Sequence, residues 1–239
     1  MQCRKCGFWL PEPTPESCPQ CNHPFHSGDD RSGPAWESRS SGIDLEAMLA
    51  TVKGVLFQPA ATFRSMRREG GMGGPLLFAV ILGTISGWFG LLWQGFIQSL
   101  GFLSEGVGDQ WLIGYIGLMV IAVLMPGFVL IGAFVSSAFW HVSLFLVGGA
   151  RKSFETTFRV TAYVSGATNL FQIIPFCGGF IGGFWYLVAM IIGVREAHEI
   201  STGRAVLAIL LPIILCCACF LVVWIFFLGP VIINAIQEM

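Results

Sequence analysis

Charged residues are scarce in this sequence. Asp, Glu, Lys and Arg together make up 11% of the 239 residues, whereas soluble domains carry about 25%. All four types are missing from four long stretches, which lie between Glu69 and Glu105, Asp109 and Arg151, Arg159 and Arg195, and Arg204 and Glu238. A membrane-spanning helix needs about 20 mostly apolar residues, and each stretch is longer than that. This scarcity excludes an ordinary soluble domain and indicates a polytopic α-helical membrane protein.

The sequence also lacks the motifs that would indicate an enzyme. It contains no HExxH pair, no phosphate-binding glycine loop, no nucleophile motif and no paired carboxylates of the catalytic kind. We therefore expect a protein that is not an enzyme. The first thirty residues lack the apolar core of a secretory signal peptide, so we expect the first spanning helix to act as the insertion signal.

Four cysteines occupy the polar head of the chain, at positions Cys3, Cys6, Cys18 and Cys21. They form two Cys-x-x-Cys motifs separated by eleven residues, a pattern typical of zinc sites with four thiolate ligands. Four protein ligands leave no open position, so the pattern predicts a structural Zn²⁺ whose binding energy folds a zinc ribbon over residues 1–26. The alternatives are a histidine ligand, His23 or His26, in place of one cysteine, and redox chemistry at the two motifs.

A polar segment and a basic helix are expected next. Residues 27–42 are rich in Ser, Gly and charge, a composition that predicts a flexible linker. From residue 43 to 70 apolar residues recur at helical spacing, and three arginines follow them, Arg64, Arg67 and Arg68. This pattern predicts an amphipathic helix in the membrane interface, with the arginines at the lipid headgroups. Packing of the same helix on the ends of the bundle is an alternative, and both can hold together.

The apolar segments lie within residues 71–235. The predicted spans cover residues 75–98, 111–149, 154–174, 179–197 and about 205–228. The second is too long for one ordinary span, so it is either one long kinked helix or two short spans. Because Lys and Arg accumulate in cytoplasmic loops, charge decides the count. Five spans place all 13 Lys and Arg residues on or near the cytoplasmic side. This predicts an inner-membrane protein with a cytoplasmic amino terminus and an external carboxyl terminus.

Polar side chains within membrane spans usually have a function. The candidates here are His141, Arg159, Tyr163 and Asn169. One interpretation joins them in a polar path through a transporter. The simpler interpretation is structural, because Arg159 can pair with Glu155 one turn earlier and Asn169 can hydrogen-bond across helices. The segment "GGFIGG" at 178–183 favours close helix packing, either within the bundle or in a homo-oligomer.

Three stretches together resemble the Yip domain family of Ypt/Rab-interacting membrane proteins. They are "VLFQPAATFRSMRREGGMGGPLLFA" at 55–79, "HVSLFLVGGARKSFETTFRVTAYVSG" at 141–166 and "IIPFCGGFIGGFWYLVAMIIGVREAHEISTGRAVLAILLP" at 173–212. The resemblance covers about residues 45–230 and implies a five-helix bundle with a cytoplasmic amino terminus. Eukaryotic members look like adaptors in vesicle traffic that bind prenylated small GTPases. An amino-terminal zinc ribbon is similar to bacterial members, and the family supplies no catalytic residues.

The sequence therefore predicts an all-α membrane protein in which a zinc ribbon precedes a five-helix transmembrane bundle. Its expected role is a scaffold or adaptor: the ribbon recruits a cytosolic protein, and the bundle contacts membrane proteins or lipid. A small-solute transporter or channel with a regulatory ribbon is the alternative, and a lipid-organising protein acting through residues 43–68 is a third. A nucleic-acid partner is disfavoured by the acidic residues Glu12, Glu16, Asp29 and Asp30.

Overall fold

The computed structural model describes residues 6–9, 18–21, 31–39, 42–105 and 109–237, and within the last two ranges it describes side chains up to residue 100 and from 113 to 226. The elements in these ranges are all helical, as expected. In chain order they are η1 (Ala35–Ser38), α1 (Leu45–Phe57), α2 (Pro59–Ser65), α3 (Gly73–Glu105), α4 (Asp109–Leu146), α5 (Phe154–Asn169), η2 (Leu170–Ile173), α6 (Gly178–His198) and α7 (Thr202–Gln237).

Four helices in the described part of the chain are long and apolar enough to cross a membrane. The segments that meet this requirement are Gly73–Leu100, Ile113–Leu146, Gly178–His198 and Thr202–Phe226. They coincide with four of the five predicted spans. The long second segment is one continuous helix, α4, with Pro126 inside it, so it is not divided into two spans.

The remaining predicted span, residues 154–174, corresponds to α5 followed by the short helix η2. α5 has 16 residues and is less apolar than the four long helices, and most of its residues are buried. It packs against α3, α4 and α6. Because its surface meets protein on several sides, α5 does not need the unbroken apolar run that lipid demands of an exposed helix. It is the central helix of the bundle.

Residues 31–39 belong to the folded structure, so the prediction of a flexible linker is wrong for this part of 27–42. Trp36, in η1, is fully buried. Its backbone N–H donates to Thr51 Oγ1 at 2.9 Å, and its indole Nε1–H donates to the carbonyl oxygen of Gly74 at 2.8 Å. Its ring meets Phe78 edge-on, with centroids 5.9 Å apart. One aromatic side chain with both donors satisfied anchors a segment whose overall composition is that of a linker.

The helices α1 and α2 pack on the bundle. The residues of α1 that face inward are Met48, Thr51, Val52 and Val55. α1 contacts η1 and α5, and α2 contacts α6. Leu45 and Leu49 of α1 stay largely exposed. Of the two predictions for residues 43–70, packing on the bundle therefore holds for one face of α1. The other face of α1 presents apolar side chains outward.

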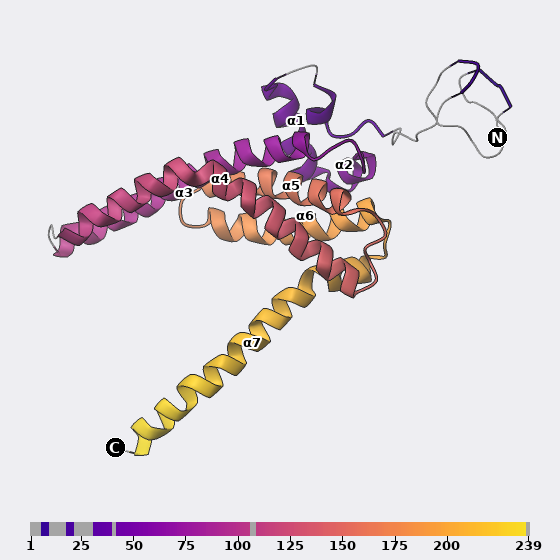
Figure 1. The fold of residues 1–239 in the computed structure, drawn as a ribbon. Helices are drawn as coiled ribbons and strands as arrows, with labels where there is room; N and C mark the ends of the chain where they lie inside the picture. Colours follow the sequence, from indigo (N-terminus) through magenta and orange to yellow (C-terminus); the bar gives the residue numbers. More distant parts are fainter. Residues whose placement is uncertain (1–5, 10–17, 22–30, 40–41, 106–108, 238–239) are drawn as a thin grey trace.

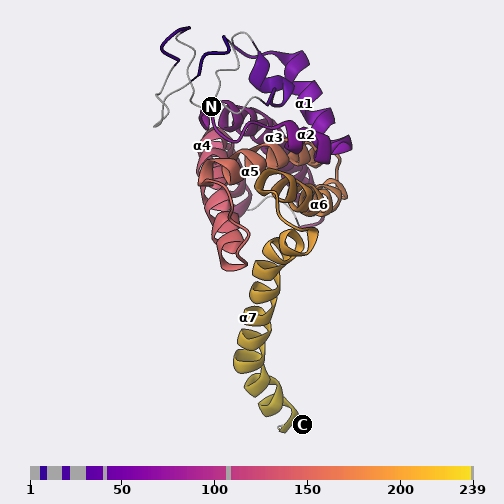
Figure 2. The same cartoon turned by 90° about the vertical axis from the view of Figure 1, so that its right-hand side faces the viewer.

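The long helices extend away from this packed region. Figure 1 shows α3 and α4 side by side and reaching beyond α5 and α6, while α7 leaves the bundle and projects away from it. The view in Figure 2 likewise places the last turns of α7 far from α1 and α2. The first turns of α7 are packed, with Ala205, Ala208 and Ile209 fully buried, whereas residues 213–226 are all exposed. These exposed apolar surfaces suit contact with lipid.

Replacing Trp36 tests the anchored segment. We expect Trp36→Ala to lower the free energy of unfolding by about 3–5 kcal/mol, because it removes a fully buried aromatic side chain. The measurement is denaturant unfolding of the purified protein in detergent. The matched control is Trp224→Ala, on the projecting part of α7, where the side chain is half exposed and its loss should matter little. Equal effects of the two variants would contradict the buried position of Trp36.

Candidate functional site

A buried ion pair joins η1 to α5. Arg159 Nη2 lies 2.5 Å from Glu37 Oε1, and the two side chains are only 2% and 6% exposed. The hydroxyl of Tyr163 donates to the same Glu37 oxygen at 2.6 Å. Arg159 Nη1 donates to the carbonyl oxygen of Gly71 at 2.6 Å and lies 3.4 Å from Glu155 Oε1, the partner that its i,i+4 spacing predicts. Burying each ion costs several kcal/mol, so both charges depend on these partners.

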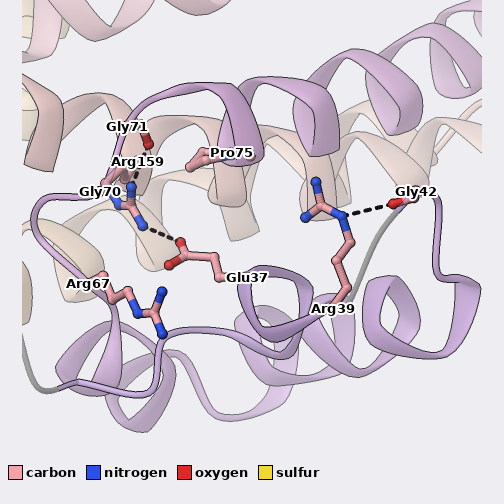
Figure 3. A pocket seen from close by; sticks show the side chains of 9 residues that line it. Glu37, Arg39, Gly42, Arg67, Gly70, Gly71, Pro75 and Arg159 are labelled. Carbon is pink, nitrogen blue, oxygen red and sulfur yellow. Dashed lines mark hydrogen bonds and ion pairs between the residues drawn. The ribbon is translucent and has the colours of Figure 1, made fainter.

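A cavity of about 280 Å³ opens beside this ion pair. Its charged lining residues are Glu37, Arg39, Arg67 and Arg159, and the rest of the wall is formed by Gly42, Gly70, Gly71, Gly74 and Pro75. Figure 3 shows Arg159 and Arg67 reaching toward the Glu37 carboxylate from either side. Gly70 and Gly71 have φ angles of 127° and 92°, which favour glycine, so the path of this wall depends on them.

The three arginines predicted at the membrane interface occupy different environments. Arg64 Nε lies 3.1 Å from Glu196 Oε2, and the Arg64 side chain is mostly exposed. Arg68 pairs with Glu199, and this hydrogen bond holds the pKa of the Glu199 carboxyl below its usual range. Arg67 turns toward the cavity instead. The structure thus divides a group of arginines that the sequence presents as one basic cluster.

Glu199 gathers several chain segments at one end of the bundle. Its carboxylate lies 3.4 Å from Lys152 Nζ and 3.5 Å from Arg31 Nη2, in addition to Arg68. Its carbonyl oxygen accepts a hydrogen bond from Arg151 Nη1 at 3.2 Å. These contacts bring together the segments that lead into α3 and α5 and the segment that follows α6.

A hydrogen-bonded chain links α4, α5 and α6. The backbone N–H of Lys152 donates to His198 Nδ1 at 3.2 Å, so His198 in its neutral form carries its proton on Nε2. That Nε2–H donates to Thr157 Oγ1 at 3.0 Å, and Thr157 Oγ1 also lies 2.8 Å from His141 Nδ1, in a hydrogen bond whose direction depends on the His141 tautomer. His141, in α4, is therefore hydrogen-bonded to α5 through Thr157 and linked through it to His198 of α6.

The four polar residues predicted within the spans fall into three places. Arg159 and Tyr163 meet at Glu37, whereas His141 bonds Thr157. Asn169 lies toward the other end of α5, beside a cavity of about 170 Å³ whose other lining residues are Thr168, Gln172, Gly178, Gly179, Gly182, Gly183 and Tyr186. The arrangement brings together two of the four side chains and separates the others.

Three of the four predicted metal ligands lie close together. The sulfur atoms of Cys6, Cys18 and Cys21 are all within 4.8 Å of one another, and those of Cys6 and Cys18 are 3.5 Å apart. In a tetrahedral site with 2.3 Å Zn–S bonds, neighbouring sulfurs are about 3.8 Å apart, so this donor set fits zinc. Gly7 has a φ of 73°, the conformation that a turn after Cys6 requires. Cys3, the fourth predicted ligand, lies outside the described residues.

The sequence interpretation missed several residues that form the buried ion pair, its cavity and the histidine–threonine hydrogen-bonded chain. They are Trp36, Glu37, Arg39, Thr157 and His198. The tryptophan was the available signal, because a large aromatic residue is unusual in a polar linker. Glu37 and His198 carried no comparable signal, since each acts through partners distant in the sequence.

Long apolar helices, with buried polar contacts at one end of the bundle, define a polytopic helical membrane protein. A family profile described as the Yip1 domain matches residues 53–225. The chain therefore belongs to the Yip1 domain family, which confirms the resemblance seen in its three sequence stretches. Comparisons with curated proteins and with solved structures found no match.

Breaking the ion pair should destabilise the protein strongly. We expect Arg159→Met to lower the free energy of unfolding by about 3–5 kcal/mol, because it leaves the Glu37 carboxylate buried without its cation. Adding Glu37→Gln to this variant should restore part of the loss, since the buried charge is then gone. The measurement is a double-mutant cycle of denaturant unfolding in detergent.

The control for this cycle is Arg64→Gln, which removes a cation from a mostly exposed pair. It should change stability little, because water screens that pair. If Arg159→Met were no more destabilising than Arg64→Gln, the buried pair would not stabilise the fold.

Proposed function

We propose that the protein is a non-enzymatic membrane scaffold or adaptor, in which the cytoplasmic zinc ribbon recruits a cytosolic protein and the bundle contacts membrane proteins or lipid. The observation that carries this proposal is the anchoring of residues 31–39 in the bundle through Trp36 and Glu37. Only residues 22–30 separate Cys21 from this anchored segment, a reach of about 35 Å at full extension. A partner bound at the ribbon is thereby kept close to the membrane surface.

The proposed topology has five spans, with α5 as the third. At about 1.5 Å per residue in α5 and 2.0 Å in η2, the two helices together extend about 32 Å, close to the hydrocarbon thickness of about 30 Å. The contacts of Glu199 support this path, because they collect the start of α5 and the end of α6 at one end of the bundle. The basic residues gathered there support a cytoplasmic position for that end, and the proposed location is a bacterial inner membrane.

Zinc is proposed as the structural ion of the ribbon, with Cys3 as the fourth ligand beside Cys6, Cys18 and Cys21. The support is the close approach of the three described sulfurs. When bound, the ion folds a head too small for a core of its own. The transporter alternative gains no support from the contacts of these residues. Arg159 and Tyr163 both bond to Glu37, whereas His141 bonds to Thr157 at a separate place.

The topology is tested by labelling one introduced cysteine at a time from each side of the membrane. Lys152→Cys precedes α5, and Phe176→Cys follows η2, in a background in which Cys177, Cys216, Cys217 and Cys219 are serine. Five spans predict that a membrane-impermeant maleimide labels the two positions from opposite sides, as located by peptide mass spectrometry in right-side-out and inverted vesicles. Labelling of both positions from the same side would show that α5 does not cross the membrane.

The adaptor role is tested by capture from native membranes with Cys18→Ser as the variant and Cys177→Ser as the matched control. We expect one zinc ion per chain in the wild type and in Cys177→Ser, and its loss in Cys18→Ser, because Cys18 is a proposed ligand. A cytosolic protein should be enriched with the first two and missing from the third. Loss of zinc with an unchanged set of captured proteins would contradict recruitment by the ribbon.

A further inference from the structure

We propose that the cavity beside Glu37 and Arg159 is a binding site for a phosphate ester that also carries a hydrogen-bond donor. Phospholipid headgroups of the glycerol or ethanolamine type have this chemistry, and so do small soluble phosphate esters. The proposal rests on the membrane placement of α3 in the proposed function, but not on the ribbon or its partner.

The charge of the cavity favours an anion. Three arginines and one glutamate line it, a formal excess of two positive charges. Arg39 is fixed in place: its guanidinium stacks 3.9 Å from the ring centroid of Trp36 and donates to the carbonyl oxygens of Trp36 and Gly42. Guanidinium groups are well suited to phosphate because their planar N–H donors match its oxygens. Arg39 therefore presents a preoriented cation at the cavity wall.

Arg67 supplies the adjustable cation. Its Nε donates to the carbonyl oxygen of Arg31 at 3.1 Å, which holds the base of the guanidinium. Its two Nη atoms form no hydrogen bond or ion pair with any side chain in the described part of the protein, and the residue is only partly buried. Arg67 points into the cavity (Figure 3), so these N–H groups can donate to a phosphate that enters it.

Glu37 restricts the kind of anion that fits. Its Oε1 is occupied by Arg159 and Tyr163, but its buried Oε2 has no protein hydrogen-bond partner within the described ranges. Buried polar atoms without a partner are rare because they lose their hydration without replacement. A bare anion would face this carboxylate oxygen unfavourably, whereas a ligand with a hydroxyl or ammonium group beside its phosphate satisfies it. The cavity is therefore complementary to both parts of such a ligand.

The location and size of the cavity suit a headgroup. Its wall includes Gly71, Gly74 and Pro75, which lie where α3 begins and where the candidate span from Gly73 to Leu100 enters the membrane. The unsatisfied N–H groups of a helix start also favour a phosphate. A volume of about 280 Å³ is slightly below the range of about 300–1,000 Å³ typical of small-molecule sites. It accommodates a headgroup and leaves the acyl chains outside.

The test is calorimetric titration of the full-length protein in a neutral detergent with three probes: dihexanoyl-phosphatidylglycerol, dihexanoyl-phosphatidylcholine and glycerol 3-phosphate. We expect saturable binding of the phosphatidylglycerol. Binding of the phosphatidylcholine should be weaker by about tenfold or more, because its trimethylammonium group has no N–H to donate to Glu37. Glycerol 3-phosphate distinguishes a soluble ligand from a lipid. An affinity equal to that of the phosphatidylglycerol assigns the site to soluble phosphate esters, and a much weaker affinity assigns it to lipid.

Two arginine variants separate the cavity from general surface charge. Arg67→Gln should weaken phosphatidylglycerol binding by about tenfold, and Arg67→Lys should recover part of it. Arg64→Gln removes the same charge three residues away, outside the cavity, and should change the affinity by less than about twofold. A thermal unfolding midpoint close to that of the wild type establishes that each variant is folded.

Several outcomes would overturn the proposal. They are no binding of phosphatidylglycerol or glycerol 3-phosphate, equal binding of phosphatidylcholine, or an equal loss of affinity in Arg64→Gln and Arg67→Gln. Partner capture through the ribbon should be unchanged in Arg67→Gln. Failure of the cavity proposal is therefore distinguishable from failure of the adaptor proposal.

Discussion

The ion pair between Glu37 and Arg159 is the constraint on which the polar end of this protein depends. Two charges that are almost fully buried need their partners, because each has lost its hydration. Tyr163 and the carbonyl oxygen of Gly71 supply the remaining hydrogen bonds. Since these groups come from η1, from the segment before α3 and from α5, one network fixes three parts of the chain relative to one another. Loss of any one partner leaves the others buried without compensation.

The same end of the molecule collects its connecting segments. Glu199, directly after α6, pairs with Arg68 from the segment before α3 and with Lys152 from the segment before α5. The rest of the long helices presents apolar surface, as residues 213–226 of α7 show. The protein thus has one braced, polar end and an apolar body. The proposed adaptor role would benefit from this division, because a head joined to residues 31–39 is attached to the packed end of the bundle.

The parts of the fold that meet lipid were predictable from the sequence. α3, α4, α6 and α7 need unbroken apolar runs, and such runs are visible without a structure. The pairing of Arg159 with Glu155 was predictable from its spacing. The central position of α5 was not predictable, because a helix enclosed by protein can carry polar residues. The hydroxyls of Thr161 and Thr168, for example, donate to backbone carbonyl oxygens one turn earlier in α5. Nor was Glu37 predictable, since its partner Tyr163 lies 126 residues away and no local pattern records such a contact. The average composition of residues 27–42 predicted a linker, because a single tryptophan changes that average little. Trp36 nevertheless anchors residues 31–39 in the fold.

Hydrogen–deuterium exchange of residues 31–39 in the full-length protein tests the central claim most directly. The claim is that the Glu37–Arg159 pair holds this segment in the folded bundle. The account predicts that the backbone N–H of Trp36 exchanges slowly, with protection similar to that of α5, because it donates to the buried Thr51 hydroxyl. Exchange of this segment as fast as in an unstructured peptide of the same sequence, while α5 stays protected, would contradict it.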